Sequence, residues 1–158
     1  MEQLTTPKSF VIRPKTAYCL VLTFPIFLIA FCTLSAALFF PFYSLIILIP
    51  FGIISLYALY KYLLIRSYRY EISQEKITWS RGILSRNIDF LELYRVKDYR
   101  VQQPLTLRII GSMHLILETS DRSHPIFLFK GIPYSNFPDE LRKLVEFNRD
   151  RKRVYEVD

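Results

Sequence analysis

The histidine and cysteine side chains, which bind zinc most readily and which serve as bases and thiol nucleophiles, number only four in this sequence and are spread too thinly to act together. His114 and His124 are its two histidines, and Cys19 and Cys32 are its two cysteines. The cysteines lie thirteen residues apart in one apolar stretch, so a disulfide between them is not geometrically available. Zinc sites in proteins need three or four ligands from such residues. We therefore expect no metal and no cofactor.

The two histidines lie in different local settings. Residues 113–119 alternate in polarity, which places His114 on the same strand face as Ile116 and Glu118. We expect an exposed or half-buried strand residue there, the alternative being a metal ligand or a general base. His124 lies in a polar turn, where we expect it to be solvated. Glycine-rich phosphate loops, HExxH and GxSxG are all missing from the sequence, so we expect no enzymatic activity.

Basic side chains are more numerous, with 21 Lys and Arg against 14 Asp and Glu and a net charge of +7. One group borders the apolar segments and is expected at a membrane interface: Lys15, Lys61, Arg66 and Arg69. Two further groups are Arg95, Lys97 and Arg100, and Arg151, Lys152 and Arg153. Each of these is either a solvated surface or a surface for a protein partner or anionic lipid. Nucleic-acid binding is not expected, because no stacking motif accompanies them.

The elements that position these groups begin with an uncharged run. Between Lys15 and Lys61, 45 residues carry no Asp, Glu, Lys, Arg or His. At ~1.5 Å per residue, one helix of this length would extend roughly 67 Å, about twice the hydrocarbon core of a bilayer. The run must therefore fold back, and Pro41 marks the turn. We predict two transmembrane helices, from Thr16 to about Phe39 and from about Phe42 to Leu64.

The flanks of this helical pair predict its orientation. Basic residues precede the first helix and follow the second, and the turn at 40–44 carries no charge. An excess of Lys and Arg marks the cytoplasmic side of membrane proteins. We therefore expect a protein of the cytoplasmic membrane with two spans and both termini in the cytoplasm.

The remainder of the chain, residues 67–158, has an ordinary globular composition and mostly a strand pattern. The predicted strands are 68–72, 77–80, 83–90, 93–101, 113–119 and 125–130. The sequence thus divides into a cytoplasmic N-terminal segment (1–15), a transmembrane hairpin (16–66) and a cytoplasmic domain (67–158).

A single amphipathic helix follows the strands. Ser135 or Asn136 can cap it, and Asp139 and Glu140 fall in its first turn, where acidic groups favour the positive end of the helix dipole. Its apolar stripe comprises Phe137, Leu141, Leu144 and Val145, with Asn148 one turn on. Short antiparallel strands closed by one such helix predict an α+β domain with a strongly bent sheet or partly open barrel.

The order of apolar segments and glycines in this domain resembles that of the bacterial pleckstrin-homology-like (PH-like) domain. The segments are Tyr70-x-Ile72, Ile77, Gly82-Ile83-Leu84, Leu93-x-Arg95-Val96, Gln102 or Gln103, and Leu107-Arg108-Ile109-Ile110-Gly111. Over about residues 40–147 the chain is similar to small membrane proteins in which two transmembrane helices precede such a domain. This resemblance implies a seven-stranded, two-sheet bent antiparallel β-barrel with a C-terminal capping helix, and no catalytic residues. One departure is Gly111-Ser112-Met113, where the family often has a further glycine.

Two function hypotheses follow. The first is a non-enzymatic membrane protein whose PH-like domain is a docking module for a membrane or cytoplasmic protein partner, or for anionic lipid. Protein docking is favoured, because two helices already anchor the domain in the lipid bilayer. The second is an accessory subunit of a membrane transport or secretion assembly, whose hairpin packs against larger partners through small residues such as Ser35-Ala36-Ala37. A homo-oligomer is compatible with both.

Overall fold

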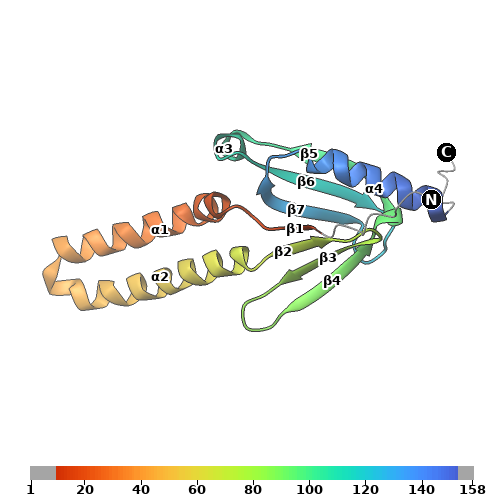
Figure 1. The fold of residues 1–158 in the computed structure, drawn as a ribbon. Helices are drawn as coiled ribbons and strands as arrows, with labels where there is room; N and C mark the ends of the chain where they lie inside the picture. Colours follow the sequence, from red (N-terminus) through yellow and green to blue (C-terminus); the bar gives the residue numbers. More distant parts are fainter. Residues whose placement is uncertain (1–9, 153–158) are drawn as a thin grey trace.

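Two long antiparallel helices extend from one end of a β-rich domain (Figure 1). The structure, a computed structural model, describes residues 10–152. Helix α1 is Thr16–Phe39 and helix α2 is Ser44–Arg66, joined by a short 3-10 turn, η1, at Pro41–Tyr43. Both helices are long and apolar enough to cross a membrane. The predicted fold-back at Pro41 is confirmed, and the predicted helix bounds agree to within two residues.

Small side chains allow α1 and α2 to pack closely. Cys19, Thr23, Ala30 and Ala37 of α1 and Ala58 of α2 are buried, whereas large apolar side chains on both helices are mostly exposed. The Thr23 hydroxyl donates a hydrogen bond to the Cys19 carbonyl at 2.8 Å, which satisfies it within the helix. Ala37, which the sequence offered as a contact for a larger partner, is buried within the chain itself.

The domain has two antiparallel sheets and two further helices. Its elements are β1 Phe10–Ile12, β2 Arg69–Ile72, β3 Lys76–Arg81, β4 Asn87–Glu92, η2 Leu93–Arg95, β5 Val96–Gln102, α3 Leu105–Ile109, β6 Ser112–Thr119, β7 Ile126–Pro133 and α4 Phe137–Lys152. The first sheet has the order β1-β2-β3-β4 and the second β5-β6-β7. In the part of the chain that the structure describes, no strand pairing joins the sheets into a closed barrel.

The seventh strand, β1, was missed by the strand pattern, although the resemblance implied seven strands. It precedes α1 and pairs with β2, which follows α2; Phe10 lies opposite Ile72 and Ile12 opposite Tyr70. In the order of the chain, the helical pair is therefore inserted between β1 and β2, which are neighbouring strands of one sheet. Two further differences are that residues 83–86 form a loop and residues 93–95 a 3-10 turn, both of which were predicted as strand.

The core lies between the two sheets, and α4 covers it. Both sheets supply fully buried side chains to it, among them Tyr70, Ile77 and Leu91 from the first and Leu115 and Phe129 from the second. From α4, the predicted stripe residues Phe137, Leu141 and Val145 are buried with them, and Leu144 is partly buried. The Tyr70 hydroxyl accepts a hydrogen bond from the Lys130 backbone N–H at 3.2 Å, which links the sheets, and burial raises the pKa of that hydroxyl.

Candidate docking site

Strand β4 is the edge of the first sheet and carries two large exposed apolar side chains. Within the described residues its outer side has no strand partner. Ile88 and Phe90 lie two positions apart on one face of the strand, with 59% and 65% of their surface exposed. Leu91, on the other face, is fully buried. An unpaired strand edge beside apolar side chains is the surface to which an extended peptide adds as a further strand.

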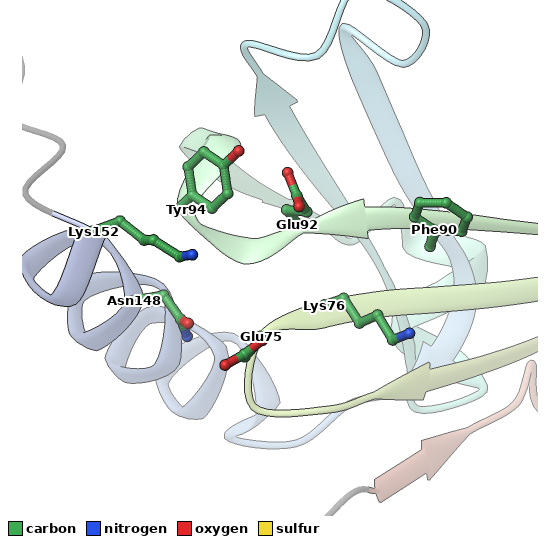
Figure 2. A pocket seen from close by; sticks show the side chains of 7 residues that line it. All are labelled: Glu75, Lys76, Phe90, Glu92, Tyr94, Asn148 and Lys152. Carbon is green, nitrogen blue, oxygen red and sulfur yellow. The ribbon is translucent and has the colours of Figure 1, made fainter.

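The strand leads into a cavity of about 240 Å³ (Figure 2), at the end of the domain away from α1 and α2 (Figure 1). The lining comes from the β2–β3 turn, β3, β4, η2 and α4: Glu75, Lys76, Phe90, Glu92, Tyr94, Asn148 and Lys152. Figure 2 shows the Lys152 side chain extending from α4 into the space between the helix and the strands. Two carboxylates, two ammonium groups and two aromatic rings therefore share one hollow.

Both carboxylates of this cavity are paired with arginines. Glu92 lies 2.9 Å from Arg95, and the Tyr94 hydroxyl, followed by the Arg95 guanidinium, holds the pKa of Glu92 below its ordinary value. Glu75 is hydrogen-bonded and ion-paired to Arg151, which lowers the pKa of the Glu75 carboxyl. Both acids are therefore ionised at neutral pH, and the cavity holds charges of both signs.

Asn148 fixes the shape of this cavity. Its side chain is buried, and its amide donates hydrogen bonds to the carbonyls of Gln74, at 2.5 Å, and Leu144, at 2.7 Å. The first of these bonds ties α4 to the β2–β3 turn. The backbone N–H of Leu93 also donates to the Glu75 carbonyl at 2.9 Å, so the turn is held from both sides.

The predicted partner or lipid surface is spread over two regions. Arg95 and Lys152 both lie near Glu92. Arg151 precedes Lys152 on α4 and pairs with Glu75. Lys97 and Arg100 lie along β5, where both are exposed and Arg100 is 3.8 Å from Glu118. Arg153 lies outside the described residues. Whether these groups bind anything stays a prediction.

The four predicted interface residues lie where the helices join the domain. The Lys15 ammonium donates hydrogen bonds to the carbonyls of Ile110, at 3.1 Å, and Gly111, at 2.9 Å, and thereby holds the start of α1 against the end of α3. Lys61 lies over the Tyr57 ring and Arg66 donates to the Tyr62 hydroxyl. Arg69, in β2, is 3.9 Å from Glu71. Contact of these residues with lipid stays a prediction.

The histidines serve packing in this structure. His114 is half-buried, as predicted; its Nδ1 accepts a hydrogen bond from the Gly131 N–H at 2.9 Å and its ring packs edge-on against Tyr18 of α1. The prediction that His124 is solvated was wrong, because its ring packs edge-on against the buried Trp79 at 5.0 Å between centroids.

Sequence reasoning missed Glu75, Phe90, Glu92, Tyr94 and Asn148 as members of a site. Asn148 was placed on the apolar stripe of the last helix, and that position alone signalled a buried polar group with a structural partner. The alternation of Ile88 and Phe90 with the buried Leu91 was a second signal, since it puts apolar residues on both faces of one strand.

Comparison with known families agrees with this architecture. A model of the bacterial PH domain family matches residues 21–142, which include most of the helical pair and the domain as far as the start of α4. No curated protein and no solved structure matches the chain. Because the match covers well over half of the sequence and the two-sheet fold with its closing helix is consistent with it, the chain belongs to the bacterial PH domain family.

Proposed function

We propose that this chain is a non-enzymatic protein of the cytoplasmic membrane whose PH-like domain docks an extended segment of a protein partner along β4. The observation that carries the proposal is the edge of β4, which has no strand partner among residues 10–152, exposes Ile88 and Phe90, and ends at a cavity of mixed charge. Strand addition supplies affinity through backbone hydrogen bonds, and side-chain pockets supply specificity.

The membrane part of this proposal is supported by the sheet as well as by the helices. Because β1 and β2 pair, the start of α1 and the end of α2 lie on one side of any membrane that the helices cross. The basic residues that flank both ends, with no charge at the turn, favour the cytoplasmic side.

The charges of the cavity favour a protein partner over a lipid headgroup. Glu75 and Glu92 are ionised and line the cavity, and both would repel a phosphate. Because Lys76 and Lys152 line the same cavity as these carboxylates, its mixed charge is complementary to a peptide that carries side chains of both signs rather than to an anion alone. Since β4 runs from the helical pair towards the cavity, the partner we propose is a membrane protein whose segment leaves the bilayer beside α2 (Figure 1).

A photo-crosslinking amino acid at position 90, in the full chain in its own membrane, tests this function. We expect one discrete protein adduct. It should be lost in the Ile88→Lys variant, because a lysine on an edge strand disfavours the addition of another strand. Phe147, exposed on α4, is the matched control position and should give no such adduct.

Three other results would contradict the proposal. Adducts with lipid alone would make the domain a lipid-binding module. Adducts found only at an exposed position of the helical pair, such as Leu38, would favour the accessory-subunit hypothesis. Equal adducts at positions 90 and 147 would show that β4 has no preference for a partner.

A further inference from the structure

The connection between β3 and β4 carries the most exposed large apolar side chain of the described residues. Leu84 is fully exposed, and its neighbour Ile83 is 44% exposed. Two arginines, Arg81 and Arg86, flank them and are also exposed. An apolar tip between two cations has the chemistry of a membrane interface, where apolar groups enter the acyl region and cations meet phosphates.

This loop lies directly beside α2. A cavity of about 430 Å³ is lined on one side by Gly82, Ile83, Leu84 and Ser85 of the loop. On the other side it is lined by Leu56, Leu59, Tyr60, Leu63 and Leu64 of α2. Figure 1 shows the β3–β4 connection reaching towards the helical pair, away from the rest of the first sheet.

The depth of these α2 residues determines the depth of the loop. A hydrocarbon core of ~30 Å takes about 20 helical residues. Counted from Ser44, just after the turn between the helices, such a span reaches about Leu63. Leu56, Leu59 and Tyr60 then fall inside the bilayer, in its last two helical turns, and the loop that shares a cavity with them lies at the same level.

Backbone and side-chain geometry fix the loop in this position. The Gly82 N–H donates to the Ser67 hydroxyl at 3.1 Å, and that hydroxyl donates to the Leu64 carbonyl of α2 at 2.7 Å. Gly82 has φ +118°, and a Cβ there would come within 1.8 Å of the Ser85 carbonyl oxygen. The tight turn at the tip therefore requires glycine, and its first residue is attached to the end of α2.

We propose that the β3–β4 loop inserts Ile83 and Leu84 into the cytoplasmic leaflet beside α2, with Arg81 and Arg86 at the level of the lipid phosphates. The loop surface contacts the lipid bilayer. Its apolar tip suits the acyl region, its flanking cations suit the phosphates, and the adjoining α2 residues lie at the corresponding depth. The loop is a third membrane contact, which prevents the domain from swinging about the helix ends. This inference rests on the proposed membrane topology.

Fluorescence quenching in the full chain tests the insertion. Cys19→Ala and Cys32→Ser supply a background without cysteine, and one cysteine is added at Leu84, labelled with an environment-sensitive fluorophore and reconstituted in vesicles of phosphatidylethanolamine and phosphatidylglycerol. Two controls share the design: Ile53→Cys, exposed in the middle of α2, and Ser123→Cys, exposed in the β6–β7 turn.

We expect lipids with nitroxide on the acyl chain to quench positions 84 and 53 severalfold more than position 123, and aqueous iodide to quench only position 123. Since an apolar label could draw the loop into the membrane, the unlabelled cysteines are also treated with a membrane-impermeant maleimide. Position 84 should react severalfold more slowly than position 123.

Each contrary outcome points to a different failure. Quenching of position 53 by lipid and of position 84 by iodide would overturn the loop insertion alone. Quenching of position 53 by iodide would overturn the membrane topology on which the inference rests. Protection of position 84 from both quenchers would mean that protein covers the loop, which also overturns the proposal.

Discussion

At the scale of single residues, Gly131 carries the contact between the helical pair and the domain. It has φ +58°, its N–H donates to His114 and its carbonyl accepts from the Lys15 N–H. The Tyr18 ring lies so close that a Cβ on Gly131 would be 2.2 Å from two ring carbons. No other residue type has both the left-handed backbone and the missing Cβ that this contact requires.

We therefore expect Gly131→Ala to destabilise the protein by more than the ~1–2 kcal/mol that a left-handed alanine costs, because the methyl group also meets Tyr18. Thermal unfolding in detergent micelles measures this. Adding Tyr18→Ala should recover the steric part and leave the backbone part. Gly52→Ala is the control: no atom of the described residues lies within 4 Å of that Cβ in α2, so it should be neutral or stabilising. If the losses of stability caused by Gly131→Ala and Tyr18→Ala were strictly additive, the proposed clash between the two side chains would be contradicted.

His114 makes the same junction sensitive to acid. Burial, and then the charge of Lys130, lowers the pKa of His114 from its ordinary 6.5. A lowered pKa means that the unfolded chain binds the proton more readily, so the stabilisation is complete above the ordinary pKa and is lost as pH falls through it towards the folded value. Protonation of Nδ1 also removes the acceptor for the Gly131 N–H.

The expected result is a thermal midpoint that falls as the pH is lowered below 6.5, the ordinary pKa of histidine. His114→Asn keeps an acceptor but does not titrate, and should flatten this dependence. Ser123→Ala, at an exposed position of the β6–β7 turn, is the control and should leave it unchanged. An unaltered pH profile in the His114 variant would show that other groups cause the loss.

At the scale of elements, α4 is attached to the first sheet through Asn148. Asn148→Ala removes two donors and leaves the Gln74 and Leu144 carbonyls with fewer partners, which should cost about 1–3 kcal/mol. Hydrogen exchange should accelerate in the last turns of α4 and in the β2–β3 turn. Phe147→Ala, at the exposed neighbouring position, should change neither. Equal acceleration in both variants would mean that Asn148 does not hold the turn.

Elements with strong local signals were predictable from the sequence. The 45-residue uncharged run and Pro41 gave both long helices, and period-2 alternation gave six strands. β1 was missed because it has three residues and its partner lies beyond the helical pair, so no local pattern marks it. The cavity was missed because its lining comes from the β2–β3 turn, β4, η2 and α4, and sequence spacing does not reveal that they meet.

At the scale of the whole molecule, the pairing of β1 with β2 requires the start of α1 and the end of α2 to lie on the same side of a membrane that the helices cross. If both outer helix ends are cytoplasmic, the turn at Pro41–Tyr43 faces the opposite side. In the cysteine-free background, a cysteine at Phe42, which is 90% exposed, should react with an impermeant maleimide added to intact cells. A cysteine at Ser123 should react only after the membrane is opened. Labelling of position 123 in intact cells would reverse the proposed orientation.

The insertion of the helical pair between β1 and β2 also sets an order of events during synthesis. β1 leaves the ribosome before either helix, and β2 leaves it only after both. β1 therefore has no partner strand while about 60 residues are made. At 5–20 residues per second, this interval is on the order of several seconds. If one of the two helices enters the membrane, the strands can meet only when the other enters as well, so that the two form a hairpin. A nascent chain with just one helix inserted keeps β1 and β2 apart, so completion of the sheet excludes insertion of a single helix.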